Sequence, residues 1–257
     1  YAMIAYQTAY LKANYPLEFL CSLMNCDIGN FEKLSSYINE VKKFGFEVFN
    51  PDINDSEAHF QVIYDNNKKA IGIRYGLSAI KNIGENSVIE IIKDREKNGK
   101  FKSLVGLLKR VNNSALNKKI VEALIFSNSL SKLEKNQKFL IEKMEEIILF
   151  NVNYHRNNTK NQNNLFSEDN DDNIFNSFGH QNLEANEKLE MEFKAFGFYL
   201  SEHPTKLHKG LLKEKEYSDI GDLFDDNNHK INRKIIASIT EKKERKSKTG
   251  KNFCFFK

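Results

Sequence analysis

The chain has 257 residues, of which 40% are hydrophobic and 29% charged, so it can bury the core of one large domain or of two to three small ones. Its 39 Lys and Arg residues against 35 Asp and Glu residues give a net charge of +4, which does not by itself indicate a nucleic-acid partner. No apolar run approaches the roughly 20 residues that span a bilayer, so no membrane partner is expected.

The three cysteines, Cys21, Cys26 and Cys254, show neither CxxC spacing nor histidines at the intervals of metal ligands. We interpret them as reduced thiols of a cytoplasmic protein, and we expect no metal site. Tyr1 lies inside a helical pattern, and the last residues lie inside a predicted strand. These ends suggest an internal fragment of a longer protein.

Helical patterns dominate the first 50 residues. Apolar and aromatic residues suit a buried helix over residues 1–13, and Pro16 begins a second helix that extends to Met24. A third helix is predicted from Phe31 to Phe44, because apolar side chains recur there every three or four residues until Gly45 ends it. A short strand over residues 46–49 follows.

A β-hairpin is predicted next, because apolar residues alternate over residues 60–64 and 71–75 with turn chemistry at Asp65–Lys68. The chain then forms a short apolar helical turn over residues 77–80, which is interrupted around Gly84. A second helix follows, and Asn86 or Ser87 is expected to cap its first turn. Such a helix pair presents backbone N–H groups to an anion such as phosphate. An ordinary corner of a packed domain explains this stretch equally well.

Further helices are predicted over residues 104–110, 118–126 and 136–150, with Ser103 and Asn117 as caps of the first two. Residues 117–130 have the size of a second helix-hairpin-helix half, although their turn at Ser127–Ser129 contains no glycine. Asn128 tolerates the left-handed backbone conformation, so the turn can still form.

The composition changes at Asn151, and residues 151–182 are rich in Asn and Asp and predict a solvated linker. Gln162, Leu165 and Phe166 lie within it. Apolar side chains in such a segment have no core to enter, so they are candidates for the pocket of a partner.

The C-terminal part is predicted to contain helices over residues 183–195 and 205–213, a strand over 234–241, a basic turn over 242–250 and a return strand over 252–256. His203 precedes a proline and has no catalytic partner nearby, so we interpret it as structural. Basic residues followed by phenylalanines suit a platform for single-stranded nucleic acid, and equally a solvated hairpin tip on a small barrel. The basic residues are Lys242, Lys243, Arg245, Lys246 and Lys248.

Five ordered blocks resemble the alpha subunits of bacterial DNA polymerase III, the C-family replicative polymerases. They read YAMIAYQTAYLKANYPLEFL from Tyr1, GIRYGLSAIKNIGENSVIEII from Gly72, GKFKSLVGLL from Gly99, QNNLF from Gln162 and EFKAFGFYLSEHP from Glu192. The resemblance implies a mainly α, multi-domain chain. Its parts would be the end of the fingers (1–51), a clamp-binding region with tandem helix-hairpin-helix motifs (52–151), a linker with the clamp peptide (152–182), a helical connector (183–229) and the truncated start of an OB-fold (230–257).

The resemblance also implies residue roles. Tyr6, Gln7 and Lys12 match the fingers helix near the incoming nucleotide. The palm carboxylates that hold Mg²⁺ for nucleotidyl transfer lie upstream in the family and have no counterpart here. The full-length protein would therefore be a DNA-directed DNA polymerase that uses Mg²⁺, whereas this fragment would have no catalytic residue and no cofactor and would be inactive alone.

The implied partners are duplex primer-template DNA, single-stranded DNA, the sliding clamp (beta subunit) and other subunits of the polymerase III holoenzyme. Gln162, Leu165 and Phe166 match the clamp peptide of the form Q-x-x-L-F, and the basic cluster from Lys242 to Lys248 would bind single-stranded DNA. Asn86 stands where the family commonly has a second glycine, which weakens one backbone contact to phosphate. The expected duplex contacts are Lys81, Gly84, Glu85, Asn86 and Lys93.

Two other functions remain open from the sequence. One is an error-prone paralogue of the same polymerase, which a weak or dispensable clamp peptide would favour. The other is a non-enzymatic DNA-binding adaptor with helix-hairpin-helix motifs, which a start codon immediately upstream of Tyr1 would favour.

Overall fold

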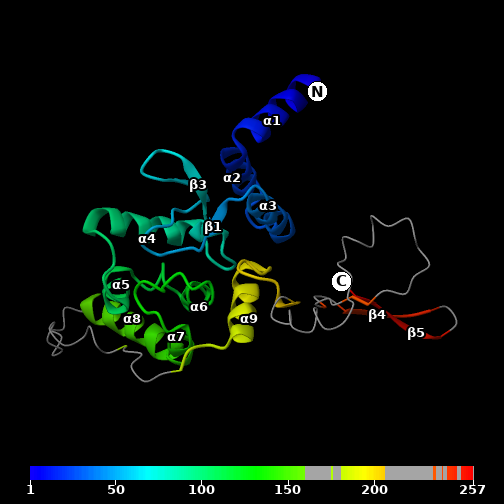
Figure 1. Cartoon of the computed structure of the whole chain (residues 1–257). Coiled ribbons are helices and arrows are strands. Elements are labelled where there is room, and N and C mark those ends of the chain that lie inside the picture. Colours follow the sequence, from blue (N-terminus) through cyan, green and yellow to red (C-terminus); the bar gives the residue numbers. More distant parts are fainter. Residues whose placement is uncertain are drawn as a thin grey trace. The chain divides into compact units, whose positions relative to one another are not determined.

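The computed structural model describes residues 1–159, 175, 181–205, 234, 235, 239, 242–247 and 250–256. The chain divides into two compact units, Tyr1–Leu200 and Ser201–Lys257. Over the described residues it contains nine α-helices and two small sheets (Figure 1), which confirms the mainly α prediction. In the same residues, no helix combines the length and hydropathy of a membrane span.

Three helices open the first unit: α1 (Ala2–Asn14), α2 (Pro16–Cys26) and α3 (Phe31–Lys43). Pro16 begins α2 as predicted, and Asn30 caps α3 by accepting a hydrogen bond from the Lys33 N–H. The prediction that the first helix is buried is wrong, because α1 buries none of its residues and Met3 is 67% exposed. Its apolar residues are spread round the helix axis and form no single stripe that could dock.

A three-stranded sheet of order β1-β3-β2 follows, formed by β1 (Glu47–Phe49), β2 (Gln61–Tyr64) and β3 (Ala70–Arg74). The antiparallel pairing of β2 with β3 confirms the predicted hairpin. The sequence did not predict that β1 pairs with β3 in parallel. Gly72 permits this pairing, because a Cβ at that position would lie 2.2 Å from the Glu47 carbonyl oxygen.

The rest of the first unit is helical. It consists of the 3₁₀ turn η1 (Leu77–Ala79) and the helices α4 (Glu85–Asn98), α5 (Leu104–Arg110), α6 (Lys118–Phe126), α7 (Gln137–Glu142), α8 (Met144–Thr159) and α9 (Ala185–Phe196). Ser103 and Asn117 cap α5 and α6 as predicted. Buried apolar residues from α2 through α9 form one hydrophobic core.

The loop between β1 and β2 joins several of these elements. The Asn54 side chain exchanges two hydrogen bonds with the backbone of Phe101, after α4. Arg95, on α4, is buried and donates to the carbonyl oxygens of Ile53 and Ser56 and to the Glu57 carboxylate. The loop thereby fixes α4 and the start of α5 relative to the sheet.

Two helix predictions need correction. The helix expected over residues 136–150 is divided at Lys143 into α7 and α8. In addition, α8 continues to Thr159, into the predicted linker, where Asn151 is buried and donates to the Leu108 and Val111 carbonyl oxygens. Phe175 of the same segment is also buried, with its ring centre 5.7 Å from that of Phe150. The linker was predicted from the polar composition of the segment, and composition carries no information about tertiary contacts such as these.

The second unit contains the antiparallel hairpin β4 (Lys242–Lys246) and β5 (Asn252–Phe256). The return strand is confirmed, but the predicted basic turn is wrong because Lys242–Lys246 form a strand. Of the strand predicted over 234–241, residues 234, 235 and 239 are described, and Lys234 makes a single β-bridge. The helix predicted over 205–213 lies outside the described residues except for Thr205.

Candidate nucleic-acid interface

The first hairpin, residues 80–84, connects η1 to α4. Asn82 adopts the left-handed conformation with φ 65°, whereas Gly84 has φ −82° and precedes the helix as its N-cap. Since α4 begins at Glu85, Asn86 and Ser87 lie inside its first turn, and the prediction that either of them caps the helix is wrong.

The N-terminus of α4 is open to solvent. Gly84, Glu85 and Asn86 are exposed, and no side chain of the described residues caps the helix. A Cβ at Gly84 would meet no atom of the described structure within 4 Å, so another molecule can approach the backbone closely. Free N–H groups at a helix N-terminus favour an anion. Glu85 opposes this preference with its own charge, and its carboxylate lies 3.1 Å from His59 Nε2.

The two expected lysine partners of this hairpin lie apart. Lys93 is exposed on α4, eight residues beyond Glu85 and therefore about 12 Å along the helix axis. Lys81 points toward α3 and α9, with its Nζ atom 4.7 Å from the centre of the Phe31 ring. The structure therefore brings together Gly84, Glu85 and Asn86, without either lysine.

A second hairpin joins α5 to α6 through residues 111–117, not within residues 117–130 as predicted. The predicted turn at Ser127–Ser129 follows α6 and leads into further turns instead of a helix, although Asn128 does adopt the left-handed conformation with φ 58°. In the actual hairpin, the Asn112 side chain accepts hydrogen bonds from the backbone N–H groups of Ser114 and Ala115.

Lys118 and Lys119 form an exposed basic pair in the first turn of α6, directly after the Asn117 cap. Two positive charges at a helix N-terminus are unfavourable for the isolated helix and become favourable beside an anion. These lysines are not among the contacts predicted from the sequence, although a basic pair that follows a capping Asn is visible in it. On electrostatic grounds, the N-terminus of α6 suits an anion better than that of α4.

Comparison with known proteins connects these hairpins to one family. The family model described as a helix-hairpin-helix motif matches residues 45–140, which include both hairpins. DNA polymerase III subunit alpha of Borreliella burgdorferi is 42% identical over 214 residues, which cover 81% of this chain and 18% of that protein. The Aquifex aeolicus subunit is 32% identical over 258 residues, which cover 100% of this chain and 20% of that protein.

The chain is thus homologous to DNA polymerase III alpha subunits. The subunit from Treponema pallidum agrees, with 30% identity over 259 residues. The chain spans about a fifth of the length of the relatives it matches, since it covers 18% to 21% of these three alpha subunits.

The helix expected from the sequence to match the fingers of the alpha subunits is α1. Tyr6 and Gln7 are exposed along it, and Lys12 is half-buried. The rings of Tyr6 and Tyr10 lie 6.3 Å apart, and the Lys12 ammonium forms an ion pair with Glu40 on α3 at 2.5 Å. Lys12 therefore already has a partner within this chain.

The β4–β5 hairpin separates its side chains onto two faces. Lys243 pairs with Phe255 and Arg245 with Phe253, so these four side chains share one face. The rings of Phe253 and Phe255 lie 5.4 Å apart, edge to face, and are 40% and 57% exposed. Lys242 and Lys246 belong to the other face, where the Lys242 ammonium forms an ion pair with the Glu244 carboxylate. The first face combines cations with exposed rings.

The remaining predicted residues are not placed. Gln162, Leu165, Phe166 and Lys248 lie outside the described residues. Within the described part of the chain, no group of three or more His, Cys, Asp or Glu side chains could hold a metal ion.

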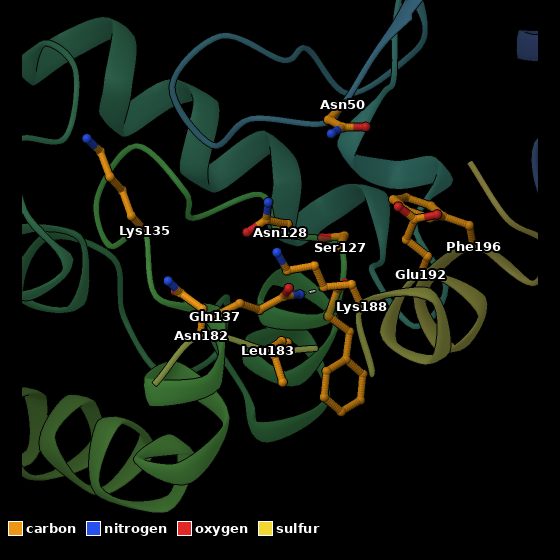
Figure 2. Close-up of a pocket in the computed structure, with 11 residues that line it drawn as sticks. Asn50, Ser127, Asn128, Lys135, Gln137, Asn182, Leu183, Lys188, Glu192 and Phe196 are labelled. Carbon is orange, nitrogen blue, oxygen red and sulfur yellow. Dashed lines mark hydrogen bonds between the residues drawn. The ribbon is translucent and has the colours of Figure 1, made fainter. Parts of the chain in front are cut away.

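A cavity of about 160 Å³ lies beside the turn after α6 (Figure 2). Gln137 donates to the Ile125 and Phe126 carbonyl oxygens, and Glu192 accepts from the Leu200 N–H. Gln137 thereby joins α7 to the end of α6, and Glu192 joins α9 to the residues that follow it. The lining of the cavity mixes amides, two lysines and a carboxylate; it includes Asn50, Asn128, Lys135, Gln137, Lys188 and Glu192.

Proposed function

We propose that this chain is the part of a DNA polymerase III alpha subunit that binds duplex primer-template DNA and attaches the enzyme to the sliding clamp. The observation that carries the proposal is the coincidence of the helix-hairpin-helix match over residues 45–140 with two hairpins that lead into exposed helix N-termini. Backbone N–H groups at such ends bind phosphate oxygens without reading sequence.

The proposed duplex contacts come from both hairpins. At the first hairpin they are the backbone of Gly84 and Asn86, with Lys93 further along α4. At the second they are Lys118 and Lys119, whose charges complement phosphate. Binding of this kind is independent of sequence and decreases steeply with salt.

The proposed division of the chain keeps the end of the fingers at residues 1–51, followed by the helix-hairpin-helix region. Because α8 continues to Thr159, we place the end of that region at Thr159 instead of Asn151. The linker with Gln162, Leu165 and Phe166 follows, then the helical connector and the start of an OB-fold. In the last of these, the face with Lys243, Arg245, Phe253 and Phe255 is the proposed single-strand platform, because cations there flank exposed rings.

The activity of the whole protein is proposed to be template-directed DNA synthesis with Mg²⁺ held by palm carboxylates. The described residues of this chain offer no carboxylate cluster for a metal ion. We assign no catalytic step to this chain and propose that it does not extend a primer by itself.

Salt-dependent binding of a labelled DNA duplex tests the duplex-binding role. Replacing both Lys118 and Lys119 by Gln should reduce the slope of log K against log salt concentration by about 1.8, since each lost phosphate contact contributes about 0.9. The matched control replaces the exposed Lys68 and Lys69 of the β2–β3 turn by Gln, which should leave the slope unchanged. Equal slopes for both double variants would reject the assignment of α6 as a contact.

A further inference from the structure

Lys81, in the loop between η1 and α4, attaches this loop to α9. The backbone N–H of Lys81 donates to the Ala195 carbonyl oxygen of α9 at 2.9 Å. The Lys81 ammonium lies 4.7 Å from the centre of the Phe31 ring on α3 and 5.8 Å from that of Phe193 on α9. Lys81 therefore joins the first hairpin to two helices that are distant in the sequence.

Gly197 leaves the space that this lysine occupies. It ends α9 in the left-handed conformation with φ 78°, which favours glycine. A Cβ at this position would lie 2.8 Å from Lys81 Nζ and 3.1 Å from Cγ of Phe31. The backbone conformation favours glycine here, and a Cβ would displace the Lys81 ammonium from its present position.

Further contacts fix the same end of α9. Phe196 is 1% exposed, and its ring centre lies 4.8 Å from that of Tyr75, which directly precedes the turn into η1. The Leu200 carbonyl oxygen accepts a hydrogen bond from Lys42 Nζ of α3 at 2.6 Å. Since α9 lies outside residues 45–140, these contacts extend the structural unit of the first hairpin beyond the family match.

We infer that Lys81 is a positioning residue for duplex binding, which holds the first hairpin on α3 and α9 and does not contact phosphate. The inference rests on the proposed function and refines it, because the sequence prediction made Lys81 a charge partner of phosphate. A cation above an aromatic ring is stabilised by the ring itself. To reach a phosphate, the ammonium would have to leave Phe31 and Phe193, and the loop that precedes α4 would lose the contribution of these ring contacts to its attachment.

Duplex binding by the full chain at several salt concentrations separates the two roles. Lys81→Met keeps the aliphatic stem and removes the charge, whereas Lys81→Arg keeps a cation for the rings. If Lys81 positions the loop, Lys81→Met should lower affinity by the same factor at every salt concentration, about 2- to 30-fold. Lys81→Arg should restore the affinity. A fall of about 0.9 in the salt slope of Lys81→Met would overturn the inference, because that is the mark of a lost phosphate contact.

Hydrogen exchange provides a measurement that does not depend on DNA. Lys81→Met should accelerate exchange in residues 80–84 and 193–200, whereas Lys93→Met, which removes an exposed lysine of α4, should not. Unchanged exchange in Lys81→Met would overturn the inference. If the unaltered chain fails to bind duplex, the proposed function fails, and exchange alone decides whether Lys81 attaches α9 to the hairpin.

Discussion

At the scale of single residues, ion pairs fix the loop between β1 and β2 to segments far along the chain. The Asp55 carboxylate accepts hydrogen bonds from Lys100, after α4, and from Lys132, after α6. Lys132 also lies 3.3 Å from the buried Asp52. Sequence periodicity does not predict such pairs, because they join residues that are 45 and 77 positions apart.

Asp55 should make stability depend on pH. Burial raises its pKa, but hydrogen bonds from Lys100 and Lys132 outweigh burial and lower the pKa from 3.8 to about 2. Because the folded-state pKa is depressed, the stabilisation is fully present above the unfolded value and is lost as the pH falls from about 4 to about 2. We expect Asp55→Asn to cost about 1 kcal/mol at pH 7, since solvent screens the exposed lysines.

Urea denaturation at a series of pH values measures this effect. The difference between the unaltered chain and Asp55→Asn should shrink below pH 4. Glu90→Gln, at an exposed position of α4, is the control and should not reproduce this narrowing. A difference that stays constant from pH 7 to pH 2 would contradict the role of the ion pairs.

At the scale of elements, local patterns predicted some structures and missed others. The β2–β3 hairpin was predictable, because apolar residues alternate along both strands and residues typical of turns lie between them. The strand β4 was not, since its KKERK sequence has little β propensity and no buried face. The division between α7 and α8 was also missed, because the apolar pattern continues through Lys143.

Among the contacts between elements, we expect those of Arg95 to contribute most to the free energy of unfolding. It is 9% exposed and binds the Ile53 and Ser56 carbonyl oxygens and the Glu57 carboxylate, so it joins α4 to the loop after β1. Arg95→Met would leave two carbonyl groups without this donor and should cost about 2–4 kcal/mol.

Urea denaturation at pH 7 checks this value. Lys97→Met changes an exposed residue of the same helix and should cost less than about 0.5 kcal/mol. Equal effects of the two substitutions would show that the buried guanidinium does not hold the loop.

At the scale of the whole molecule, the proposed attachment to the sliding clamp depends on a short peptide. Leu165→Ala together with Phe166→Ala should abolish clamp binding by the full chain, because these side chains would fill apolar pockets of the partner. Surface plasmon resonance with the clamp immobilised measures the affinity.

The control for this prediction uses the variable positions of the Q-x-x-L-F pattern. Asn163→Ala together with Asn164→Ala should leave the affinity unchanged, since neither residue is a fixed position of the peptide. Unchanged affinity in the Leu165 and Phe166 double variant would reject the clamp-peptide assignment and would favour the error-prone paralogue.

The sequence by itself determined the features that depend on neighbouring residues. Three- and four-residue spacing predicted α3, capping residues predicted the starts of α5 and α6, and ordered blocks of residues indicated the polymerase III alpha subunits. Only the tertiary structure decided the features that need distant partners. These are the parallel pairing of β1 with β3, the extension of α8 and the contact of the Lys81 side chain with α3 and α9. The physical reason is that a local pattern limits the backbone conformation of a segment, whereas packing selects which distant group each side chain meets.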